Sequence, residues 1–184
     1  MVISWLCRSY TPLRPSKALE AVIHEIFEEL LDRIREASLL HYGARLKSLA
    51  VFGSVARATE RPDSDIDLLI VAEPLPAGRM KRVQEFAEVE CGLGEHLAVA
   101  AKKGVRTELS PIFKTPEELE IGSFLLLDFV DQARILYDPQ QVLEHRLDRL
   151  RLRLEELGAR RVRRGGGYYW LLKPDLKPGE RIEL

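Results

Sequence analysis

Residues 65–72, with the sequence DIDLLIVA, constrain the fold of this chain more than any other segment. Every side chain after Asp67 is apolar, whereas a strand with one solvated face alternates apolar and polar residues. A strand that is apolar on both faces is typical of the centre of a sheet covered on both sides. We therefore expect residues 65–72 to form a central strand.

Helical and extended patterns alternate along the rest of the chain. Apolar side chains recur at steps of three and four after Ser16, which predicts a helix with Ser16 as its N-cap that ends near Gly43. Further strands are expected at 46–52, 105–113 and 134–137, with Pro111 favouring an edge position or a bulge. Further helices are expected at 80–103, from Pro116, at 123–130 and from Pro139 to Gly158. This order predicts an α/β (α+β) fold, a small mixed sheet of three to five strands flanked by helices.

We divide the chain into an irregular lead (1–15), one α/β domain (16–138) and a C-terminal extension (139–184) made of a helix and a basic, aromatic tail. The 184 residues include 28 Lys and Arg against 29 Asp and Glu, a net charge of -1. This balance excludes a globally basic protein, so the net charge does not indicate direct nucleic-acid binding, although such binding stays open.

No apolar run approaches the roughly 18 residues of a membrane span, and the N-terminus lacks a secretory pattern. We therefore expect a cytoplasmic protein without a membrane partner. Cys7 and Cys91 lie far apart and form no CxxC motif, which indicates neither a disulfide scaffold nor a zinc site.

Asp65 and Asp67 are the first candidates for chemistry. Side chains two apart on a strand project from the same face, so the two carboxylates repel each other and a divalent cation is their natural counter-charge. Oxygen ligands without nitrogen or sulfur favour Mg²⁺ or Mn²⁺. The alternative is a pair of solvated turn residues. A calcium loop is excluded because its sixth position, a glycine in such loops, is Leu68 and its twelfth, a glutamate, is Pro74.

Gly53 and Ser54 lie where the strand at 46–52 ends and a helical turn is expected. A glycine there lets the backbone approach a phosphate, which N–H groups and the Ser54 hydroxyl can bind. A phosphate site beside a metal-binding carboxylate pair suits phosphoryl or nucleotidyl transfer. The chain contains neither a Walker-type GxxxxGK[ST] nor a GxSxG motif, which excludes a P-loop enzyme and a serine hydrolase.

The combined pattern of Gly53-Ser54, Arg57 and Ser64-Asp65-Ile66-Asp67 before an apolar strand resembles the DNA polymerase β-type nucleotidyltransferase superfamily. The minimal nucleotidyltransferase (MNT) branch is the best match, over about residues 17–137. The resemblance implies that Asp65 and Asp67 bind Mg²⁺ or Mn²⁺ while a nucleoside monophosphate moves from a nucleoside triphosphate, ATP in the first instance, to a hydroxyl. Gly53 and Ser54 would then hold the β- and γ-phosphates.

The resemblance also implies a third carboxylate on a later strand, and Glu108 occupies the corresponding position. It would complete the metal site and accept the proton of the acceptor hydroxyl; the alternative is a solvent-facing strand residue. Arg57 would bind the triphosphate, or else pair with Asp63 or Asp65 as part of the scaffold.

The MNT resemblance implies an antitoxin that pairs with a HEPN-type ribonuclease toxin and silences it by adding AMP. Two alternatives stay open, a nucleotidyltransferase for a small molecule such as an antibiotic and a catalytically weak antitoxin that acts by binding alone. We expect the tail beyond Gly158, rich in arginine and carrying Tyr168, Tyr169 and Trp170, to serve the partner or acceptor.

Overall fold

A four-stranded mixed sheet forms the centre of the molecule. The computed structural model describes residues 16–121, 126–164, 167–177, 180 and 182. The strand order is β3-β2-β1-β4, with β1 antiparallel to both β2 and β4 and β2 parallel to β3. The strands are β1 (Leu46–Phe52), β2 (Ile66–Ala72), β3 (Leu109–Lys114) and β4 (Arg134–Tyr137). The predicted fold class is confirmed, and β2 is an inner strand as its apolar sequence indicated.

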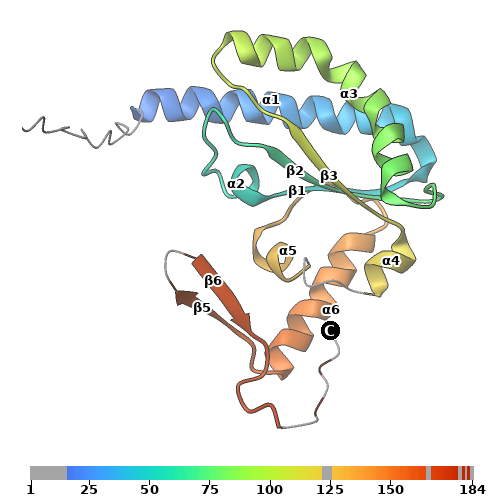
Figure 1. The fold of residues 1–184 in the computed structure, drawn as a ribbon, viewed down its shortest axis with the longest axis vertical. Helices are drawn as coiled ribbons and strands as arrows, with labels where there is room; N and C mark the ends of the chain where they lie inside the picture. Colours follow the sequence, from blue (N-terminus) through green and yellow to red (C-terminus); the bar gives the residue numbers. More distant parts are fainter. Residues whose placement is uncertain (1–15, 122–125, 165–166, 178–179, 181, 183–184) are drawn as a thin grey trace, which may run out of the picture.

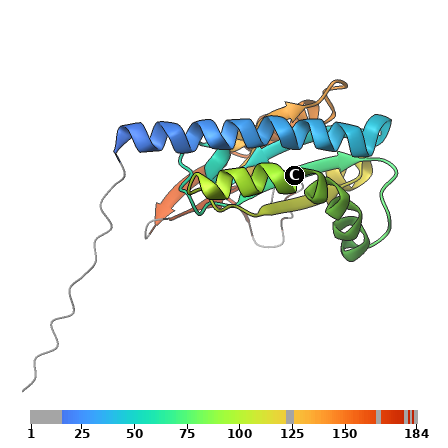
Figure 2. The ribbon, with the colours of Figure 1, turned by 90° about the horizontal axis from the view of Figure 1, so that it is seen from above.

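Helices cover both faces of this sheet (Figure 1). The long helices α1 (Lys17–Tyr42) and α3 (Arg79–Lys102) lie over one face, and Figure 2 shows α1 running along the whole sheet. The other face packs against α4 (Pro116–Glu120), α5 (Leu126–Gln132) and α6 (Val142–Glu156). Alternate residues of β2 divide between the two layers: Leu68 and Ile70 join the core with α1 and α3, whereas Leu69 and Val71 join the core with α4, α5 and α6.

Local sequence signals explain where several elements begin. The Ser16 hydroxyl accepts a hydrogen bond from the N–H of Leu19, so Ser16 caps α1 as predicted. Thr115 and Glu118 form a reciprocal capping box at the start of α4. A short 3-10 helix, η1 (Gly43–Arg45), joins α1 to β1. Pro111 lies in β3, an edge strand, which its missing N–H favours.

Two elements begin later than the sequence pattern indicated. Strand β3 starts at Leu109, because the N–H groups of Val105 and Arg106 donate to the carbonyls of Ala100 and Pro62 instead of a strand partner. Helix α6 starts at Val142. There the carboxylate of Asp138 accepts hydrogen bonds from the first helical N–H groups, those of Val142, Leu143 and Glu144, at 2.9 to 3.0 Å.

The C-terminal segment contains a β-hairpin that the sequence analysis treated as a tail. Strands β5 (Arg160–Arg164) and β6 (Gly167–Leu171) pair antiparallel. Trp170 and Leu172 pack against the core of α5 and α6, and that core also includes residues of β1 and β2. The domain boundary placed at 138/139 stays a prediction, and the irregular lead lies outside the described residues. In the part of the chain that the structure describes, no helix is long and apolar enough to cross a bilayer.

Candidate active site

The end of β1 brings the glycine of the Gly-Ser turn against the strand that carries the aspartates. Strand β1 ends at Phe52 and the short helix α2 (Gly53–Ala56) follows at once. Gly53 has φ +73°, and a Cβ atom on it would lie 2.3 Å from Oδ2 of Asp67, far inside ordinary contact. Only glycine leaves room here for the Asp67 carboxylate, so Gly53 and Asp67 form one site.

The turn that follows Gly53 is closed by Thr59. The backbone N–H of Thr59 donates to the carbonyl of Ser54 at 3.0 Å, and the Thr59 hydroxyl donates to the same oxygen at 3.3 Å. Ser54 itself is half-buried at this turn. The hydrogen bonds from Thr59 therefore fix the peptide that carries the predicted phosphate-binding hydroxyl.

Asp67 projects from the sheet face that α4, α5 and α6 cover, and Asp65 lies immediately before β2. Asp67 pairs with Phe52 of β1 and Ser110 of β3 in the strand register. Its side chain lies on the same face of β2 as that of Leu69, two residues later, which belongs to the core with α4, α5 and α6. Asp65, two residues earlier, is exposed, whereas Asp67 is half-buried. The predicted pair therefore lies beside Gly53, where β1 ends and β2 begins.

The electrostatics of Asp67 match a cation site. Burial and then the nearby charge of Asp65 raise the pKa of Asp67 above its usual value, while a hydrogen bond from Ser110 and the charge of Arg57 act in the opposite direction. A carboxylate with a raised pKa is destabilised in its ionised form, and a bound cation would remove that penalty. Mg²⁺ commonly binds one or two protein carboxylates together with substrate phosphates, so the donor set of Asp65 and Asp67 fits this ion.

Glu108 lies immediately before β3, next to Asp65 in the register of β2 and β3. Its backbone carbonyl accepts a hydrogen bond from the N–H of Ile66 at 2.9 Å, and the pairing of Ile66 with Leu109 places Glu108 level with Asp65. Its side chain is exposed. Among the described residues, no three His, Cys, Asp or Glu side chains converge to hold a metal ion. A role for Glu108 as third ligand stays a prediction.

Arg57 is the C-cap of α2 and is exposed. Its Nη1 donates to Oε1 of Gln132 at 2.7 Å, and its charge lowers the pKa of Asp67. The hydrogen bond to Gln132 ties Arg57 to α5, and Asp63 instead has Arg61 as its ion-pair partner, at 3.4 Å. Arg57 is therefore held within the electrostatic range of the aspartate site, and its contact with the triphosphate stays a prediction.

A polar network that sequence reasoning missed supports the loop between α2 and β2. The Glu60 side chain is only 3% exposed, and its Oε1 lies 2.7 Å from Nδ1 of His24 on α1. Glu28, one turn along α1, binds both terminal guanidinium nitrogens of Arg134 in β4. The loop that delivers Asp65 is thus fastened to α1, which in turn is fastened to β4. No spacing in the sequence indicated these long-range contacts.

Ser110 and Gln132 were also absent from the sequence-based candidates. Ser110 could have been found, because it lies two residues after Glu108 and therefore on the same strand face. Gln132 sits at the end of α5 and contacts Arg57 only because α5 packs under the sheet, which no local pattern indicates.

A comparison with known protein families identifies the type of domain. A model of the nucleotidyltransferase domain matches residues 28–125, more than half of the chain, and this range contains the Gly-Ser turn, both aspartates and Glu108. The chain belongs to the nucleotidyltransferase domain family. The predicted enzyme class, a nucleotidyltransferase, is confirmed.

Individual relatives are more distant. A protein of Methanocaldococcus jannaschii, named as a proposed protein adenylyltransferase, is 28% identical over 134 residues, which are 72% of this chain and 83% of the relative. A crystal structure of a toxin–antitoxin with AMP-PNP is 19% identical and covers 69% of this chain and 88% of its own, with a TM-score of 0.43. A crystal structure of a proposed nucleotidyltransferase from Sulfolobus solfataricus is 14% identical and covers 67% of this chain and 87% of its own, with a TM-score of 0.33.

Proposed function

We propose that this protein transfers AMP from ATP to a hydroxyl of a partner protein, and that this partner is a HEPN-type toxin which the transfer silences. The observation that carries the proposal is the contact between Gly53 and Asp67. It joins the turn suited to phosphates to the carboxylate pair suited to a metal ion within one family-defining segment.

Each residue of the site has a separate task in this reaction. Gly53 leaves the space in which Asp67 lies, and the Ser54 hydroxyl with the N–H groups of its turn binds phosphate oxygens. Asp65 and Asp67 would hold Mg²⁺, which when bound offsets negative charge on the α-phosphate and the leaving pyrophosphate. Arg57 adds positive charge on the phosphate side. Glu108, level with Asp65 on the next strand, would accept the proton of the attacking hydroxyl.

The choice of a protein acceptor has two supports. The Methanocaldococcus relative, which aligns with 72% of this chain, carries the name of a protein adenylyltransferase. The sequence pattern of the site independently resembles the MNT branch, whose members pair with HEPN toxins.

The test is transfer of a labelled adenylyl group. ATP labelled at the α-phosphate is incubated with Mg²⁺, this protein and a HEPN protein encoded beside it, and the products are separated by denaturing electrophoresis. We expect label on the HEPN protein with wild type and none with the Asp65→Asn/Asp67→Asn variant. Equal labelling by wild type and variant, or no labelling of any protein by wild type, would overturn the proposal.

An antitoxin that acts by binding alone is a second candidate, and the exposed side chain of Glu108 favours it. In this case the exposed Glu108 side chain does not join Asp65 and Asp67, and no group of three potential metal ligands forms among the described residues, so the site would bind Mg·ATP without activating the acceptor. The discriminating experiment measures toxin inhibition by Glu108→Gln. If transfer is required, this variant binds Mg·ATP yet fails to inhibit the toxin. Full inhibition by both Glu108→Gln and the double aspartate variant would instead support the binding antitoxin.

A further inference from the structure

The β5–β6 hairpin has a net positive charge, whereas the rest of the molecule has a net negative charge. Residues 159–172 contain four arginines and no Asp or Glu, which leaves 24 basic against 29 acidic residues elsewhere in the chain. A protein with a net charge of -1 therefore consists of an acidic body, with a charge of -5, and a hairpin with a charge of +4. Such a separation is a property of the surface and points to a ligand of negative charge.

The hairpin arginines differ in their surroundings from those of the preceding helix. On α6, Arg149 pairs with Glu120, and Arg151 pairs with Asp148 at 2.5 Å. On the hairpin, Arg160 and Arg163 are exposed. Neither forms an ion pair with any residue in the described part of the chain. The α6 arginines are thus largely neutralised, while these two remain available to a partner.

One hairpin arginine anchors the element to the body. Nη1 of Arg161 lies 3.1 Å from Oδ2 of Asp131 on α5, and its guanidinium stands 5.7 Å from the centre of the Trp170 ring. Trp170 in turn packs against the core formed by α5 and α6. The hairpin is therefore a fixed projection, and its outward face carries Tyr169, which is 48% exposed.

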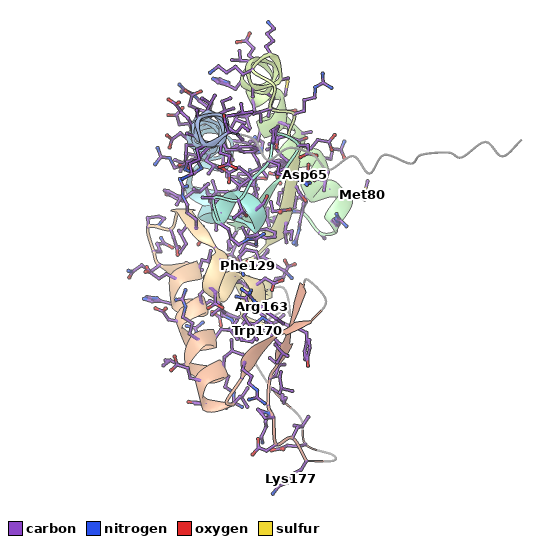
Figure 3. All side chains as sticks on the ribbon, turned by 90° about the vertical axis from the view of Figure 1, so that its left-hand side faces the viewer. Asp65, Met80, Phe129, Arg163, Trp170 and Lys177 are labelled. Carbon is purple, nitrogen blue, oxygen red and sulfur yellow. The ribbon has the colours of Figure 1, made fainter. Side chains whose placement is uncertain are left out.

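Adjacent residues of α5 connect the hairpin to the nucleotide site. Asp131 binds Arg161 of the hairpin, and the next residue, Gln132, binds Arg57 beside the aspartate pair. Asp67 also projects from the sheet face on which α5 and the hairpin pack. In Figures 1 and 2 strands β5 and β6 and the loop before β2 lie toward the same side of the molecule, and in Figure 3 Phe129 of α5 lies between Asp65 and the pair of Arg163 and Trp170.

We infer that the β5–β6 hairpin is a docking arm for an acidic segment of the acceptor protein, which it holds beside the nucleotide site. This inference rests on the proposed transfer to a protein. Arginine guanidinium groups bind carboxylates through paired hydrogen bonds, and an exposed tyrosine adds contact area.

A polypeptide fits this arm better than RNA does. Each strand of the hairpin spans five residues, or about 17 Å. The acidic body beyond it would repel a continuous phosphate backbone. An acidic segment of a protein carries its charge over a short stretch and avoids that repulsion.

Binding is tested with the full chain and two fluorescent probes, a glutamate-rich peptide with one central tyrosine and an oligouridylate of equal charge. The test variant is Arg160→Glu/Arg163→Glu. The control is Arg33→Glu/Arg35→Glu on α1, which makes the same charge change on two exposed arginines of the opposite helical layer, where they pair with Glu36 and Asp32. We expect the hairpin variant to weaken peptide binding roughly ten-fold or more and the control less than two-fold, as measured by fluorescence anisotropy at low salt.

Two results would overturn the docking arm. If both variants weaken peptide binding equally, the attraction is a general charge effect. If the oligouridylate binds wild type more tightly than the peptide, the hairpin is an RNA-binding element.

Transfer of labelled AMP to the HEPN protein separates this inference from the proposed function. We expect the hairpin variant to raise KM for the acceptor while Mg·ATP affinity stays at the wild-type value. Unchanged KM with active transfer would overturn the docking arm and leave the transferase intact. Peptide binding that depends on Arg160 and Arg163, without transfer by wild type, would overturn the proposed function and leave the arm intact.

Discussion

Replacing Gly53 by alanine tests the central contact of the site. The added Cβ would lie 2.3 Å from Oδ2 of Asp67, whereas ordinary van der Waals contact begins at 3.4 Å. The carboxylate must therefore retreat by roughly 1 Å, a displacement large enough to spoil a shared metal and phosphate site. The positive φ of Gly53 adds about 1–2 kcal/mol of backbone strain for any residue with a side chain.

Gly104→Ala provides the matched control for this experiment. Gly104 also has a positive φ, +94°, but an added Cβ would meet no atom within 4 Å. Both variants should lose about 1–2 kcal/mol of unfolding free energy, which for a chain of this size lowers the melting temperature by about 2–8 °C. Only Gly53→Ala should also lose affinity for Mg·ATP, by ten-fold or more.

Thermal melts with Mg·ATP separate the two effects. At a ligand concentration one hundred times the wild-type Kd, binding stabilises the native state by about 2.7 kcal/mol, and a ten-fold weaker site gains only about 1.4 kcal/mol. Calorimetric titration gives the same affinities directly. If Gly53→Ala keeps the Mg·ATP affinity of Gly104→Ala, the close packing of Gly53 on Asp67 is not what forms the nucleotide site.

Three further predictions concern the charges around the sheet. Ser110→Ala removes the hydrogen bond that lowers the pKa of Asp67. Calorimetry should therefore show a several-fold loss of Mg·ATP affinity, larger at pH 5 than at pH 8. Equal affinities of wild type and variant for Mg·ATP would contradict this prediction. Because the pKa of Asp67 is raised in the fold, its ionised form is the destabilised one, and Asp67→Asn should stabilise the metal-free protein at pH 7. That gain should vanish as pH falls through the Asp67 pKa in urea titrations, and a gain independent of pH would refute the reasoning. The hydrogen bonds from Arg82 lower the pKa of Glu118 to about 2. Because the Glu118 side chain is 37% exposed, Glu118→Gln should lower the unfolding free energy by only about 1–2 kcal/mol at pH 7. This loss should disappear as pH falls from 4.5 towards 2. A constant loss over that range would assign the stability to packing.

Sequence reasoning identified the parts of this fold that depend on local patterns. The apolar run after Asp67 indicated an inner strand, and the three- and four-residue periodicity indicated α1 with its Ser16 cap. The two-residue spacing of Asp65 and Asp67 indicated that the two carboxylates lie close together, and the charge of Asp65 does raise the pKa of Asp67. These inferences succeed because strand alternation and helix periodicity are set by the backbone alone.

Features that depend on tertiary contacts could not be found in this way. The sequence pattern predicted that α6 begins at Pro139. The helix begins three residues later, at Val142, where the Asp138 carboxylate accepts hydrogen bonds from its first N–H groups. Glu60 looked like an ordinary loop residue, and its burial arises only from packing against α1. The hairpin did leave a signal, since glycines separate an arginine-rich run from an aromatic one, a pattern typical of a β-turn between strands.

The measurement that tests this account most directly compares thermal melts of wild type and Asp65→Asn/Asp67→Asn, each in EDTA and with Mg·ATP. The mutual repulsion of the two carboxylates is worth about 1 kcal/mol after screening by water and salt. The double variant should therefore melt at the same or a higher temperature in EDTA and gain nothing from Mg·ATP, while wild type gains several degrees. A variant that melts several degrees lower in EDTA yet still gains stability from Mg·ATP would make these aspartates part of the scaffold and contradict the proposed site.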